Sequence, residues 1–137
     1  MRVFLCLLIF LAFSCSDSDS NPSDSCIPVI FNESKFNSAQ NFGVNLEEFS
    51  IDGSCLSVKL GVSGCDDDHT LEMVSDGSIA ESLPPQITFD FYDKNPQACQ
   101  AYFIVEREYD LSPIKELYED EIIIRFRNSD KSLVYIQ

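Results

Sequence analysis

The residues best suited to chemistry in this chain lie together in one short segment. Cys65 is followed by Asp66, Asp67 and Asp68, and then by His69, the only histidine in the sequence. Thiolate, imidazole and carboxylate groups bind zinc, and carboxylate oxygens bind calcium. The spacing does not follow an EF-hand loop, whose ligands alternate around a glycine. Asp66, Asp67, Asp68 and His69 are candidate metal ligands. A solvated acidic turn explains the same residues, and we expect no bound metal.

The sequence offers little else for catalysis. A Ser-His-Asp triad would have to use His69, and neither a Gly-x-Ser-x-Gly elbow nor a glycine-rich phosphate loop is present in the sequence. Carboxylate pairs of the glycosidase type do not discriminate in a chain with 23 acidic residues. We therefore expect a protein that is not an enzyme and needs no cofactor. His69 is expected to organise the acidic loop through exposed ion pairs, which contribute little stability.

A strong strand pattern leads into this segment. Residues 56–63 alternate apolar and polar side chains, which is typical of a strand with one buried face. The turn signals Asp52-Gly53 and Gly64 bound it. Similar patterns predict seven further strands, at residues 27–31, 44–51, 70–75, 86–92, 98–109, 121–127 and 132–136.

Helical signals are few. Residues 32–43 are polar and are expected to form a loop. Ser78 and Glu81 form a possible capping box for one helical turn over residues 78–83. Ser112 is the expected N-cap of a short helix, with Pro113 at its first position. The pattern predicts a mainly β fold, an antiparallel β-sandwich or small barrel of seven to eight strands with one short helix.

The N-terminus has the features of a targeting signal. Arg2 precedes the apolar run of residues 3–13, which is too short to span a bilayer. Cys15 follows directly, an arrangement that resembles a bacterial lipoprotein signal. The resemblance implies that residues 1–14 are removed and that Cys15 is lipidated. An ordinary secretory signal is the alternative.

A tether and one domain would follow the signal. Residues 15–25 contain Ser, Asp, Asn and Pro after the cysteine, which is typical of a flexible acidic tether. The acidic run also resembles a Bacteroidetes surface-export signal. Residues 26–137 suit a single domain. The expected location is the outer membrane, with a lipid anchor on the periplasmic face or the cell surface.

The number of cysteines agrees with lipidation. Of six cysteines, Cys6 would leave with the signal, so five remain. If Cys15 carries lipid, the other four can pair completely in an oxidising compartment.

Several motifs together resemble a family of small uncharacterised Bacteroidetes outer-membrane lipoproteins. They are Gly64-Cys65 with His69, the Pro-Gln-Ile strand at residues 85–89, Gln97-Ala98-Cys99, and the turn at residues 110–115. Members typically carry a second histidine before the later cysteine, and residues 90–93 lack it. The family resemblance places Cys65 and Cys99 in a shared core, which implies the disulfide Cys65–Cys99. Cys26 and Cys55 are then left to form the second.

The charge restricts the partners. The chain has a net charge of −14, and removal of Arg2 with the signal makes it −15. Such a chain repels nucleic acid and attracts cationic molecules. We expect a non-catalytic binding module, anchored to the membrane by lipid, with a cationic protein or a glycan as partner. The alternative is an inhibitor of a cationic enzyme such as a lysozyme.

Overall fold

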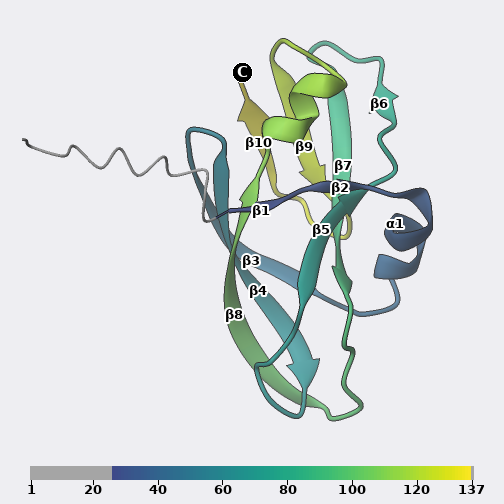
Figure 1. The fold of residues 1–137 in the computed structure, drawn as a ribbon, viewed down its shortest axis with the longest axis vertical. Helices are drawn as coiled ribbons and strands as arrows, with labels where there is room; N and C mark the ends of the chain where they lie inside the picture. The colour runs from purple at the N-terminus through teal and green to yellow at the C-terminus, as the bar shows by residue number, and fades with distance from the viewer. Residues whose placement is uncertain (1–25, 137) are drawn as a thin grey trace, which may run out of the picture.

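The protein folds into two packed β-sheets flanked by one α-helix (Figure 1). The computed structural model describes residues 26–136, so the predicted signal, Cys15 and the tether lie outside the described residues. One sheet has the order β1-β8-β4-β3. The other has the order β10-β9-β7-β5-β2, with β6 paired to β7. The mainly β sandwich is therefore confirmed, and the barrel alternative is not, because the two sheets do not close into one.

The bounds of the strands and helices follow the chain in order. They are β1 Ile27–Pro28, β2 Ile30–Phe31, α1 Glu33–Ala39, β3 Asn45–Asp52, β4 Cys55–Gly64, β5 Leu71–Ser75, β6 Ile79–Ala80, β7 Gln86–Asp93, β8 Ala101–Asp110, the 3-10 helix η2 Ser112–Glu116, β9 Ile122–Phe126 and β10 Ser132–Tyr135.

The first sheet is built around β4, as its alternating pattern predicts. All ten of its residues pair antiparallel with β8, and β3 pairs along its other edge. The apolar side chains of β4 face the second sheet and are at most 2% exposed; they are Leu56, Val58, Leu60 and Val62. The polar side chains between them face outward. One face of the sheet thus forms the core and the other faces solvent.

The expectation of purely antiparallel pairing is wrong. Three pairs are parallel: β1 with β8, β2 with β5, and β7 with β9. The last arises because the chain leaves β7 for β8 in the opposite sheet. It then returns through η2 and enters β9 in the same direction as β7.

The described chain has ten strands rather than seven or eight because its N-terminal segment serves both sheets. The single strand predicted at residues 27–31 divides at Val29 into β1 on the first sheet and β2 on the second. The Val29 N–H donates to the Asp110 carbonyl at 3.1 Å, and the Asn32 N–H donates to the Ser75 carbonyl at 2.8 Å. Figure 1 shows this segment crossing the edge of the sandwich.

The helical predictions need correction. Residues 33–39 form α1, not part of a loop, because the Asn32 side chain accepts a hydrogen bond from the Lys35 N–H and the helix buries Phe36 and Ala39. Residues 78–83 form no helical turn. Instead β6 pairs with the start of β7, whose edge offers hydrogen-bonding partners there.

The short helix after β8 is present as η2, but its predicted N-cap is wrong. Leu111 occupies the cap position and makes no side-chain capping bond, so Ser112 is the first helical residue and Pro113 the second rather than the first. The Asp110 carboxylate instead accepts hydrogen bonds from the N–H and the hydroxyl of Ser112. Among residues 26–136 no helix is long and apolar enough to cross a bilayer.

Two side chains of β8 connect the sheets at the open edge of β5. Arg107 Nη2 donates to the His69 carbonyl at 2.6 Å, and the Tyr109 hydroxyl donates to the Leu71 carbonyl at 3.0 Å. Tyr109 is fully buried, and this burial raises the pKa of its hydroxyl. Residues 69 and 71 are alternate positions, so their carbonyls face the same edge. The two side chains thus occupy positions that a neighbouring strand would otherwise fill.

A buried carboxylate lies under α1. The Arg127 guanidinium stacks on the Phe36 ring at 3.6 Å from its centroid and donates to the Phe36 carbonyl at 2.8 Å. Asp90 Oδ2 lies 3.4 Å from Arg127 Nη1 and has no hydrogen-bond partner within the described chain. Burial raises the pKa of Asp90, although a hydrogen bond from the Phe91 N–H and the Arg127 charge oppose the shift.

This raised pKa predicts a pH dependence of stability. The folded state binds the Asp90 proton more tightly than the unfolded state does. The stabilisation that this proton gives the folded state is therefore fully present below the ordinary aspartate pKa of 3.8. It is lost as the pH rises through the raised pKa. We expect Asp90→Asn to gain stability relative to the natural protein as the pH rises, measured by urea unfolding at a series of pH values.

The control is Asp130→Asn, which replaces an exposed carboxylate. It should follow the pH profile of the natural protein. A constant difference between Asp90→Asn and the natural protein at every pH would show that Asp90 does not titrate in this way.

Candidate functional site

The segment singled out from the sequence connects β4 to β5, and its histidine is buried. His69 is 3% exposed, and its Nδ1 lies 2.6 Å from Asp93 Oδ2, at the end of β7. The expectation that His69 forms exposed ion pairs with Asp66, Asp67 and Asp68 is therefore wrong. The pairing of Leu71 with Asp93 brings the His69 ring inward, beside the Asp93 carboxylate.

The imidazole ring occupies space that Gly64 leaves. A Cβ atom at Gly64 would lie 2.4 Å from His69 Nε2, which no real contact allows. Nε2 is buried and has no hydrogen-bond partner within residues 26–136. The His69 side chain is inaccessible to solvent, so a substrate could not reach the ring without a change in structure. The His69–Asp93 pair holds the end of the sandwich together.

The amide of Gln97 fixes the backbone of the acidic loop. Its oxygen accepts from the N–H groups of Cys65 and Asp66, and its nitrogen donates to Asp66 Oδ1 at 2.7 Å and to the Asp68 carbonyl at 3.2 Å. The Gln97 hydrogen bond, with one from the Asp68 backbone, lowers the pKa of Asp66.

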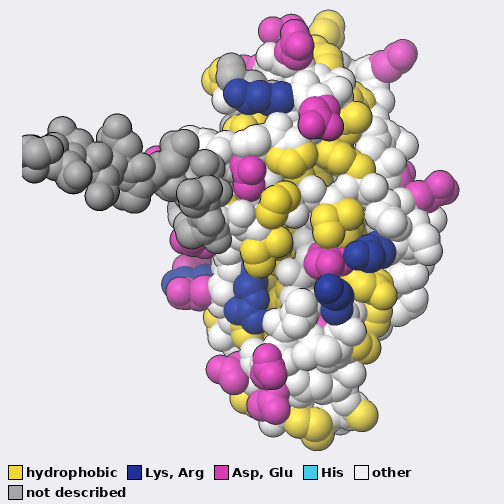
Figure 2. All heavy atoms as spheres, viewed as in Figure 1, with side chains coloured by type: hydrophobic (Ala, Val, Ile, Leu, Met, Phe, Trp, Pro, Cys, Tyr) yellow, Lys and Arg dark blue, Asp and Glu magenta, His cyan; other side chains and the backbone are white. Residues whose placement is uncertain are grey.

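A second amide, that of Asn95, completes this support. It accepts from the Thr70 N–H and donates to the Asp68 carbonyl, while its own N–H donates to Asp93 Oδ1. The carboxylates of Asp67 and Asp68 remain exposed. Acidic side chains gather at this end of the molecule in Figure 2. The loop is held from within and presents its free carboxylates outward.

No role in the acidic loop was predicted for Asp93, Asn95 or Gln97. The signal that could have found them is the polar turn at residues 93–97, just before Cys99. The disulfide Cys65–Cys99 places that turn beside the acidic loop.

Both disulfides have the predicted partners. Cys65–Cys99 joins the acidic loop to the segment before β8, and Cys26–Cys55 joins the start of the described chain to the first residue of β4. Each end of β4 therefore lies beside a covalent crosslink.

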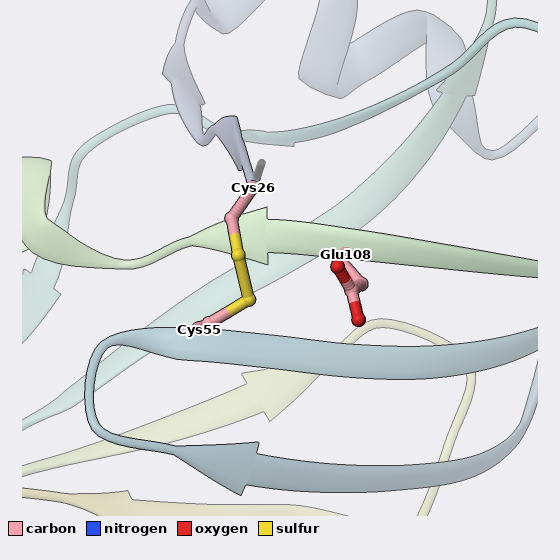
Figure 3. Close-up of side chains that lie close together, drawn as sticks. All are labelled: Cys26, Cys55 and Glu108. Carbon is pink, nitrogen blue, oxygen red and sulfur yellow. A yellow bond between two sulfur atoms is a disulfide. The ribbon is translucent and has the colours of Figure 1, made fainter. Parts of the chain in front are cut away.

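The residues described bring three potential metal ligands together at one place only. The ligand atoms of Cys26, Cys55 and Glu108 lie within 4.8 Å of one another (Figure 3). Both sulfurs belong to a disulfide, so neither is a thiolate that could bind zinc. The candidate ligands Asp66, Asp67, Asp68 and His69 form no such group, because His69 turns inward and away from the three carboxylates.

The outer face of the first sheet carries an open groove of about 650 Å³. This size is within the range of small-ligand sites. The groove crosses all four strands of the sheet, and its lining residues are Ile27, Glu48, Phe49, Ser50, Ser57, Val58, Lys59, Glu106, Arg107 and Glu108.

The groove has an excess of negative charge at its β8 side. Lys59 Nζ lies 2.9 Å from Glu48 Oε2, and this contact lowers the pKa of Glu48 and raises that of Lys59. Glu106 and Glu108, alternate residues of β8, have no ion-pair partner within 4.0 Å in the described chain. Glu108 only accepts a long hydrogen bond from the Ser57 hydroxyl, at 3.4 Å. Three carboxylates, those of Glu48, Glu106 and Glu108, thus share the single Lys59 ammonium on this face, which lies opposite Glu106 on β4.

No family model matches the chain, and no curated protein or solved structure is significantly similar to it. The resemblance to Bacteroidetes lipoproteins therefore stays a prediction.

Loss of the buried pair should destabilise the protein. His69→Ala removes the hydrogen bond between the imidazole and the buried carboxylate of Asp93, and Asp93 loses that partner. We expect the free energy of unfolding to fall by about 3 kcal/mol, measured by urea unfolding at neutral pH.

Asp67→Asn, in the same loop, is the matched control. It changes an exposed carboxylate and should alter the free energy of unfolding by less than ~0.5 kcal/mol. Similar small changes in both variants would mean that the His69–Asp93 contact does not support the fold.

Proposed function

We propose that the protein is a lipid-anchored lipoprotein of the outer membrane and that its domain is a non-catalytic module that binds a cationic protein. Cys15, directly after the apolar run, would carry the lipid and leave residues 16–25 as a tether. The domain would then be presented on the periplasmic face or the cell surface.

The observation that carries the binding role is the acidic groove on the outer face of the first sheet. Glu106 and Glu108 project from one strand without an ion pair of their own, since Lys59, opposite Glu106, is paired with Glu48, and the chain has a net charge of −14. Carboxylates that have no partner in the free protein can form ion pairs with basic side chains of another. The open shape of the groove suits a protein surface better than an enclosed small molecule.

A second candidate is inhibition of a cationic enzyme such as a lysozyme. The acidic loop favours it, because two amides and a disulfide hold the backbone while Asp67 and Asp68 stay exposed. A loop already held in one conformation loses little entropy when it enters a cleft.

Lysozyme is a suitable basic probe for both candidates. We expect the Cys15→Ser protein, which cannot be lipidated, to bind lysozyme with an affinity that falls steeply with salt. Glu106→Lys/Glu108→Lys should weaken binding at least tenfold, measured by calorimetry. Unchanged lysozyme activity in the complex supports the binding module, whereas loss of activity supports the inhibitor.

The matched control is Glu81→Lys/Glu119→Lys, which changes the net charge equally at exposed sites outside the groove. It should retain most of the affinity. An equal loss in both double variants would mean that net charge alone attracts the probe, and would overturn the role of the groove.

The lipid anchor is tested separately. In a Gram-negative host, the natural chain should incorporate radiolabelled palmitate and sediment with membranes, and Cys15→Ser should lose both properties. Cys6→Ser, within the predicted signal, should keep both. Labelling that persists in Cys15→Ser would refute the anchor.

A further inference from the structure

The free strand edges of the sandwich are covered to different extents. On β3, Lys131 Nζ donates to the carbonyls of Leu46 and Glu47. At the edge of β5, Arg107 and Tyr109 donate hydrogen bonds to the carbonyls of His69 and Leu71. β10 has only four residues. Natural sheets commonly protect their edges by such devices, because an open edge is a template for another strand.

The outer edge of β8 is a long edge that stays largely open within residues 26–136. β1 pairs with β8 only at Tyr109 and Asp110. The Asp110 carbonyl faces this edge, since it accepts from the Val29 N–H. Alternate residues point their main-chain groups to the same side of a strand. The main-chain groups of Tyr102, Ile104, Glu106 and Glu108 therefore face outward along the same edge.

Little in the described chain covers this edge. Among the described residues, only the Glu106 carbonyl accepts a hydrogen bond there, from Arg107 Nη1 at 2.7 Å. Of the outward-facing side chains on this part of β8, Ile104 is apolar and 51% exposed, whereas the Tyr102 ring lies over Gly61 and its hydroxyl donates to Glu47 on β3. Open main-chain groups and the exposed Ile104 side chain together form a surface suited to strand addition.

We propose that two copies of this chain pair through their β8 edges, antiparallel and around a two-fold axis at Ile104. The two Ile104 residues would form the central hydrogen-bonded pair. Tyr102 would then lie opposite Glu106 of the partner copy, and Gln100 opposite Glu108 of the partner copy. The first sheets of the two copies would become one continuous sheet.

The proposed register is the one that places the two Ile104 side chains directly opposite each other. An axis at Glu106 would place the two Glu106 carboxylates directly opposite each other, which is destabilising. An axis at Tyr102 would shorten the overlap and bring the pairing onto the Cys99 disulfide. With the axis at Ile104, no two carboxylates face each other, and the two exposed Ile104 side chains lie at the centre.

Charge gives this association a salt dependence opposite to that of the lysozyme complex. Two copies with a net charge of −14 or more repel each other, and salt screens that repulsion. Association should therefore strengthen as salt increases, while binding to a basic protein weakens. The two proposals can fail independently.

Disulfide crosslinking tests the register. In a hydrogen-bonded antiparallel pair the Cα atoms lie ~5.5 Å apart, which suits a disulfide. In the Cys15→Ser background, Ile104→Cys should form a covalent dimer under mild oxidation, with the new bond between the two introduced cysteines by peptide mapping. Tyr102→Cys and Val134→Cys, also at exposed strand positions, should crosslink at least tenfold more slowly.

An independent measurement needs no new cysteine. Sedimentation velocity at high salt should show a dimer for the Cys15→Ser protein and a monomer for the same protein with Ile104→Lys, with equal melting temperatures. Ile136→Lys, which changes a more exposed isoleucine outside the strands, should remain dimeric. A Cys15→Ser protein that stays monomeric, or an Ile104→Cys variant that crosslinks no faster than its controls, would overturn the proposal.

Discussion

The side chains of Arg107 and Tyr109 define how the two sheets meet. Each reaches from β8 to a backbone carbonyl before or within β5, and Tyr109 does so from a fully buried position. A buried hydroxyl must find a partner, since an unsatisfied one is costly. This requirement fixes β5 relative to β8. The N-terminal segment, residues 27–31, can then pair with both strands, through β1 with β8 and through β2 with β5.

The acidic loop depends on the same contacts. Arg107 bonds the carbonyl of His69, and the ring of His69 bonds Asp93 at the end of β7. The loop therefore joins three strands from both sheets, although its carboxylates face solvent. The fold separates two roles within a few residues: the imidazole is structural, while Asp67 and Asp68 remain free.

Local patterns predicted much of the fold, and nonlocal contacts account for the rest. The alternation in β4 was sufficient because one face of that strand is buried along its whole length. Burial of His69 could not be predicted in this way, since its partner Asp93 is 24 residues away and belongs to another strand. The helix α1 was missed because only Phe36 and Ala39 mark its buried side. The acidic groove combines side chains from separate strands, so only the pairing of β3, β4 and β8 brings it together.

The position of the Cys26–Cys55 disulfide has a mechanical consequence. A pull on the chain ahead of Cys26 would otherwise peel away β1 and β2, each only two residues long. The disulfide instead carries the load directly to the start of β4. That strand has hydrogen-bonded neighbours on both sides, so many bonds must shear together before it moves. The domain is therefore built to resist force where the preceding chain joins it.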